Sequence, residues 1–158
     1  MKKGYTLIES IIVIVVLSAA VFAIGTFLFK LTDSWATVRN KNNIASASRL
    51  AMNRMVREIR RVNKPSQIIT FTATEFRFVD VGSGTVRFYQ SGTDLYRDSD
   101  ILASNLNSSD GLSFTYLDQN GAVTATKQDI KTIRISLHLE YGDDDYYLQS
   151  SARIRNLD

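Results

Sequence analysis

The chain has 158 residues, which allow one modest globular domain beside a membrane segment. It contains no cysteine, which excludes disulfides, thiol catalysis and cysteine metal sites. The formal net charge is +3, but residues 30–64 carry nine basic and two acidic side chains, while residues 65–158 carry eight basic and thirteen acidic ones.

Residues 1–29 combine a short basic leader with a long apolar segment. Lys2 and Lys3 precede a run from Ile11 to Phe29 that has no charged side chain. About 20 apolar residues in a helix span the hydrocarbon core of a bilayer. The positive-inside rule then places the N-terminus in the cytoplasm and the rest of the chain outside.

A cleaved secretory signal is the alternative explanation of this segment. Small residues that suit a signal peptidase occur at 18–20 and at 21–23. The apolar run continues past both positions, however, and a discarded peptide has no use for the carboxylate of Glu9. We therefore favour a retained anchor.

Glu9 is the one unusual residue of the anchor. A charged side chain costs about 2.5 to 3.5 kcal/mol at the bilayer centre and less nearer the interface. Either an opposite charge offsets this cost, or Glu9 lies among the lipid headgroups and contacts water or lipid.

Residues 4–9, GYTLIE, resemble the class III leader of type IV pilins and type II secretion pseudopilins. This resemblance implies that a prepilin peptidase cleaves after Gly4 and methylates the new amino group of Tyr5, although Phe is more usual there. It also implies that Glu9 is required for assembly. Cleavage would place an ammonium group at Tyr5 within one helical turn of Glu9, where an opposite charge from a neighbouring subunit can offset the burial of the carboxylate.

Residues 30–64 have the pattern of an amphipathic helix. Apolar residues recur every three or four positions at Ile44, Ala47, Ala51, Met55, Ile59 and Val62. Polar residues occupy the remaining surface at Arg49, Asn53, Arg57, Arg60 and Arg61. Pro65 ends the pattern. Because no proline lies between Tyr5 and Lys64, we predict one continuous helix.

Residues 65–158 change to a period of two, which predicts strands. Apolar residues alternate at 76 and 78, at 86 and 88, and at 112, 114 and 116, with glycine-containing turns between them. Residues 133–141 and 146–155 form a predicted long hairpin. The sequence thus predicts an α+β fold: a leader (1–4), a transmembrane helix (5–29), an amphipathic helix (30–64) and an antiparallel β-sheet head (65–158) that this helix covers.

Little in the sequence indicates chemistry. His138, the sole histidine, falls on the polar face of its strand, so we predict an exposed side chain without a catalytic or ligand role. Asp143, Asp144 and Asp145 are the best candidates for a calcium site, but their spacing does not fit an EF-hand and a solvated hairpin tip is the simpler interpretation. We therefore expect no enzyme activity, cofactor, metal or small-molecule substrate.

A second, looser resemblance is to minor pseudopilins of the J type and minor pilins of the W type. It rests on residues 49–62 and on the segments FRF, VRFY and LYR that follow. The resemblance implies an inner-membrane subunit with an external head, which joins other minor and major subunits and helps to initiate a secretion pseudopilus or a pilus. The alternatives are a DNA-uptake (competence) pseudopilin, a permanently anchored single-pass binding domain, and a small secreted β-domain. The basic helix has few interleaved aromatic residues, so nucleic-acid binding is not expected.

Overall fold

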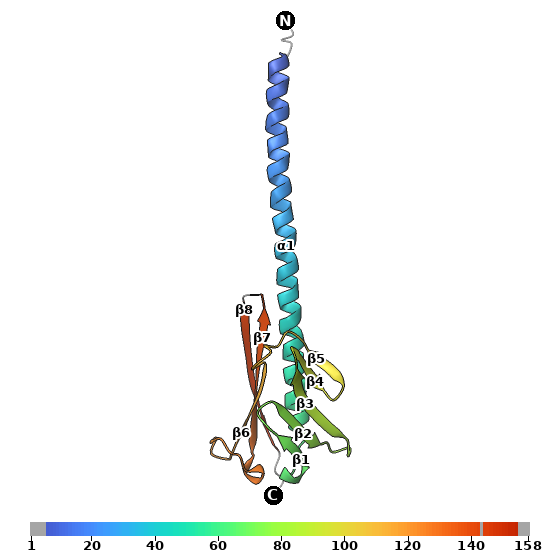
Figure 1. Cartoon of the computed structure of the whole chain (residues 1–158), viewed down its shortest axis with the longest axis vertical. Coiled ribbons are helices and arrows are strands. Elements are labelled where there is room, and N and C mark those ends of the chain that lie inside the picture. Colours follow the sequence, from blue (N-terminus) through green and yellow to red (C-terminus); the bar gives the residue numbers. More distant parts are fainter. Residues whose placement is uncertain (1–5, 143, 155–158) are drawn as a thin grey trace. The chain divides into compact units, whose positions relative to one another are not determined.

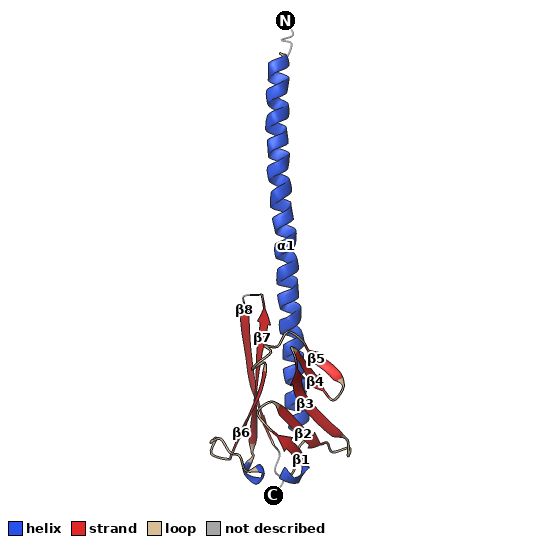
Figure 2. Cartoon of the chain, viewed as in Figure 1, coloured by secondary structure: helices blue, strands red, loops and turns tan. Residues whose placement is uncertain are grey.

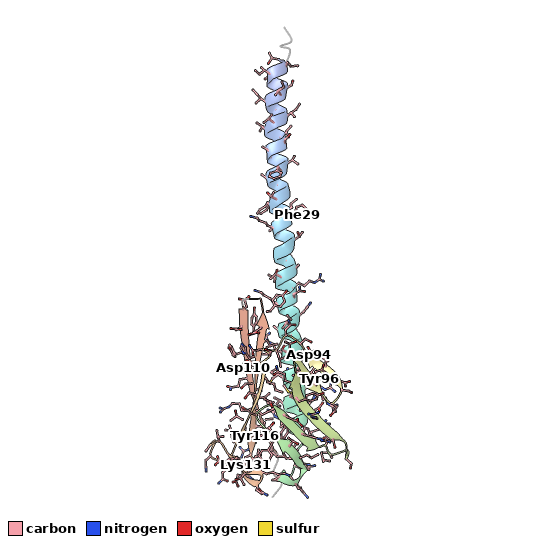
Figure 3. All side chains as sticks on the ribbon, in the orientation of Figure 1. Phe29, Asp94, Tyr96, Asp110, Tyr116 and Lys131 are labelled. Carbon is pink, nitrogen blue, oxygen red and sulfur yellow. The ribbon has the colours of Figure 1, made fainter. Side chains whose placement is uncertain are left out.

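The computed structural model describes residues 6–142 and 144–154 (Figure 1). Its first element is the helix α1, Leu7–Ile59, which contributes to two compact units, Met1–Asn42 and Asn43–Asp158. In the first unit the apolar side chains are exposed along the helix, and Phe29, labelled in Figure 3, is 75% exposed. By length and composition α1 can cross a membrane.

The second unit contains two antiparallel sheets (Figure 2). One sheet has the order β1-β2-β3-β4-β5 and the other the order β6-β7-β8. The strands are β1 (Ile68–Phe71), β2 (Glu75–Val79), β3 (Thr85–Ser91), β4 (Asp94–Arg97), β5 (Asp100–Ala103), β6 (Leu112–Leu117), β7 (Thr132–Tyr141) and β8 (Asp144–Arg153). Two short 3-10 helices, Pro65–Gln67 and Lys127–Asp129, complete the elements. The predicted α+β class and the long β7-β8 hairpin are confirmed, whereas the single sheet that we expected is divided into two.

A single apolar core joins the C-terminal part of α1 to both sheets. Met55 and Ile59 of α1, Phe76 of β2 and Phe114 of β6 belong to the same buried cluster. The rings of Phe76 and Phe114 have centroids 5.9 Å apart, which places side chains of the two sheets in direct contact. Each large apolar side chain buried in this way contributes about 1.5 to 3 kcal/mol to stability.

Tyr116 of β6 shows how a polar group is accommodated in this core (Figure 3). Its hydroxyl donates a hydrogen bond of 2.7 Å to the carbonyl of Thr72, in the turn between β1 and β2. Burial raises the pKa of Tyr116, so its hydroxyl remains a donor at physiological pH. This bond connects the second sheet to the first.

The buried face of α1 is wider than the predicted one and also includes Met52 and Glu58. Ala51, Met55 and Ile59 are buried as predicted, but Ala47 is exposed and Ser48 is buried in its place. The Ser48 hydroxyl donates to the carbonyl of Ile44 at 2.8 Å, so a polar side chain enters the core without losing a hydrogen bond.

The helix α1 also ends earlier than predicted. Its last residue is Ile59, whereas the position of Pro65 predicted an end at Lys64. The amides of Arg61 and Val62 donate to the carbonyls of Glu58 and Ile59, three residues back, at 3.0 Å each. These tighter bonds satisfy carbonyls at the end of the helix, and Val62 is fully buried. α1 therefore ends in a tighter turn before Pro65, with Val62 anchored in the core.

A fragment that starts at Lys30 is expected to fold without detergent, because it omits the apolar run and retains the whole core of the second unit. Far-UV circular dichroism should show mixed helix and strand with a cooperative thermal transition. A matched fragment from Pro65 removes Met55 and Ile59 from the core and should lose the transition. A Lys30 fragment that dissolves only in detergent would contradict this account.

Candidate functional site

Only part of the predicted N-terminal site lies within the residues that the structure describes. Gly4 and Tyr5 lie outside the described residues, while Glu9 lies in the first turn of α1. The amide of Glu9 donates to Oγ1 of Thr6 at 3.4 Å, so Thr6 caps the helix. A carboxylate in the first turn interacts favourably with the positive end of the helix dipole. The pattern T-x-x-E at residues 6–9 is the sequence signal from which this cap could have been predicted.

The basic residues of α1 in the second unit are not equivalent. Arg61 forms an ion pair of 3.0 Å with Asp80, and Arg54 one of 3.0 Å with Glu58. Arg57 and Arg60 are exposed and form no ion pair with any residue that the structure describes. Both line one groove, together with Asn53, Val56, Arg61, Asn63, Val81 and Ser150. Two positive charges at this groove are therefore available to an external partner.

Glu58 is a buried carboxylate that sequence reasoning missed. Only 6% of the residue is exposed, and its two oxygens accept from Arg54 Nε at 3.0 Å and from Arg97 Nε at 2.7 Å. The hydrogen bond to Glu58 outweighs the effect of burial and raises the pKa of Arg97. This pair ties α1 to β4. The signal was present, since Glu58 lies three residues after Met55 and seven after Ala51 on the predicted core face.

His138 is not the exposed residue that we predicted. It lies in β7 on the face away from Leu137 and Leu139, as alternation requires, yet it is only 8% exposed. Nδ1 is 2.8 Å from Asp110 Oδ1, and Nε2 is 3.2 Å from Asp145 Oδ1. The ring also stacks on that of Tyr147, with centroids 4.2 Å apart.

The segment 104–111, between β5 and β6, is what buries His138. It runs along β7: the amide of Asn107 donates to the carbonyl of His138, and the amide of His138 donates to that of Gly111, each at 2.9 Å. This pairing brings Asp110 beside the hairpin (Figure 3). Gly111 is required for the tight turn, because a Cβ there would lie 2.4 Å from the carbonyl oxygen of Asn107.

The contacts of His138 make the stability of the chain depend on pH. Burial by itself lowers the pKa of the imidazole, but the hydrogen bonds to Asp110 and Asp145 outweigh it, so the pKa of His138 is raised. A raised pKa stabilises the fold below the unfolded value of about 6.5, and this stabilisation is lost as the pH rises through the folded value.

We therefore expect the free energy of unfolding to fall as the pH increases from about 6 through the folded pKa of His138. Urea unfolding of the full chain in detergent with a chelator present measures it. His138→Gln, which cannot titrate, should remove this slope. A slope of opposite sign in the unmodified chain would contradict the account.

The acidic tip of the hairpin does not form a cluster of its own in the described residues. Asp143 lies outside them. Asp144 and Asp145 are consecutive in β8, so their side chains point to opposite faces of the sheet. Asp145 instead faces His138, and it pairs across the hairpin with Glu140.

Searches of family models, curated proteins and solved structures found no match to this chain. The architecture itself, an N-terminal apolar helix whose C-terminal part packs on antiparallel sheets, is pilin-like.

Proposed function

We propose that the chain is a minor subunit of a pilus or of a secretion pseudopilus, with no catalytic activity of its own. In this proposal a prepilin peptidase cleaves after Gly4 and methylates Tyr5. The subunit then waits in the inner membrane with its head outside, until it joins other subunits and helps to initiate the filament.

The observation that carries the proposal is the composition of α1. Its first part is apolar and exposed on every side, and its last part buries one face in a sheet-containing core. A helix that is apolar on every side can pack against lipid or against other apolar helices. A helix with one apolar face can hold a soluble head. Both requirements apply to a subunit that moves from a membrane into a filament.

Glu9 supports the same proposal through its position. It is exposed in the single chain and has Thr6, which caps the helix, as its neighbour at the start of the apolar run. In a filament or in the membrane this carboxylate leaves water, which is costly unless an opposite charge meets it. The methylated ammonium group of a neighbouring Tyr5 is such a charge and would fix the axial register between subunits.

The second unit offers a surface for other minor subunits. Arg57 and Arg60 are exposed beside a groove and unpaired among the described residues, whereas the region from residue 65 onward is acidic overall. An acidic head of another subunit would complement these arginines, and such contacts set partner choice and association rate more than total affinity.

Charge reversal at Arg57 and Arg60 tests the proposed partnership. Arg57→Glu with Arg60→Glu should weaken co-purification with the other minor subunits of the same machine, most visibly at low salt, where exposed charges are least screened. Arg61 is left unchanged, because its ion pair with Asp80 stabilises the chain itself.

A matched control reverses two other exposed arginines, Arg77 and Arg153, which lie on strands. It makes the same change in net charge and should leave the complex intact. Equal binding by both variants would refute the role of the groove, and a filament built from this chain alone would refute the minor-subunit assignment.

A further inference from the structure

The end of the β7-β8 hairpin gathers potential metal ligands on one face. His138 and Glu140 are two residues apart in β7 and so point the same way, and Asp145 of β8 pairs directly with Glu140. One ligand atom from each of the three lies within 4.8 Å of the others. We propose that His138, Glu140 and Asp145 bind a divalent transition-metal ion of the Zn²⁺ class.

The separation of the first two ligand atoms fits one metal ion. Nε2 of His138 and Oδ1 of Asp145 are 3.2 Å apart. Two ligands at about 2.0 to 2.1 Å from a tetrahedral Zn²⁺ lie about 3.3 Å from each other, so neither side chain has to move far. Glu140 is exposed, and one of its carboxylate oxygens accepts a hydrogen bond from Nδ2 of Asn107 in segment 104–111, so a small rotation of this side chain brings a carboxylate oxygen to the metal ion.

Asp110 completes the arrangement from behind the ring. Its Oδ1 lies 2.8 Å from Nδ1 of His138, on the opposite side of the imidazole from Nε2. Histidine ligands of metals commonly donate their second ring N–H to a carboxylate in this way, which fixes the ring and leaves the other nitrogen as a ligand. Asp110 is therefore a positioning residue, supplied by the segment that also buries His138.

The ligand set decides which ion fits. Ca²⁺ takes six to eight oxygen ligands, whereas an imidazole nitrogen with two carboxylates suits Zn²⁺ and similar first-row ions. Three protein ligands leave one tetrahedral position for water or for a group from another molecule. A bound ion would join β7 to β8 near the tip of the hairpin and, through Asp110, hold segment 104–111 against it.

Equilibrium dialysis of the full chain in detergent, after removal of metals by a chelator, tests the site with Zn²⁺ as the probe. We expect one tightly bound Zn²⁺ per chain and a higher thermal midpoint when it is present. Because His138 is the sole histidine and cysteine is absent, Co²⁺ should show the spectrum of a tetrahedral site with one nitrogen ligand.

Glu140→Gln is the decisive variant, since an exposed side chain of the same size leaves the fold intact. It should abolish tight binding, as should His138→Gln, while Asp110→Asn should weaken it by about 10- to 100-fold with one site retained. Asp129→Asn, an exposed carboxylate elsewhere, is the matched control. No binding, binding of Ca²⁺ in preference to Zn²⁺, or unchanged Zn²⁺ binding by Glu140→Gln would overturn the proposal.

Discussion

Glu9→Ala is expected to insert in the membrane and to be cleaved like the unmodified chain, yet to be almost absent from assembled filaments. Insertion should not suffer, because the change removes a charge that is costly in the bilayer. Assembly should fail, because the ammonium group of the neighbouring subunit loses the carboxylate that compensates it. Quantitative immunoblots of the membrane fraction and of sheared filaments measure both steps.

Glu9→Gln separates the proposed charge pairing of this residue from a role in capping the helix. Glutamine keeps the length of the side chain and serves as well as glutamate in the capping pattern with Thr6, but it has no charge. If the charge matters, glutamine should fail as alanine does. Normal assembly of the glutamine variant would show that Glu9 acts only in capping the helix, and normal assembly of both variants would refute any role in assembly.

Arg97→Met is expected to cause a large loss of stability in the second unit. The change leaves Glu58 buried with Arg54 as its remaining ion-pair partner, and Arg54 is more exposed than Arg97. Removing one partner of a buried pair costs about 3 to 5 kcal/mol, and we expect about 3 kcal/mol because Arg54 remains. Urea unfolding of the Lys30 fragment measures the loss.

The double variant Glu58→Met with Arg97→Met is the control. It removes both charges, so no carboxylate remains buried without its partner, and apolar replacements of such pairs are often neutral. We expect it to recover most of the stability lost in Arg97→Met. If the double variant loses as much free energy of unfolding as Glu58→Met and Arg97→Met lose together when each is made alone, the two residues do not act as a pair.

The sequence was informative where structure follows a local period. The three- and four-residue spacing of Met55 and Ile59 predicted the buried face of α1, and the alternation along residues 133–141 predicted both the strand β7 and the outward direction of His138. These features depend on neighbours within one element, and a single sequence records them.

The partners of His138 and Glu58 could not be predicted in the same way, although the helical spacing does place Glu58 on the core face of α1. His138 is buried because segment 104–111, about thirty residues earlier, returns along β7, and nothing in the local pattern announces that pairing. Glu58 meets its partner Arg97 because β4 brings that side chain to α1 across 39 positions. Segment 104–111 also leads into β6, which belongs to the second sheet, whereas we predicted a single sheet.

The intact mass of the protein purified from membranes, with sequencing of its N-terminus, tests the central claim most directly. The account predicts a mature chain that begins at Tyr5 and carries one methyl group on its amino nitrogen. It also predicts that Gly4→Val leaves the full-length chain uncut in the membrane. Assembled material that retains Met1, or a chain that begins after the apolar run, would contradict the assignment as a pilin-like subunit.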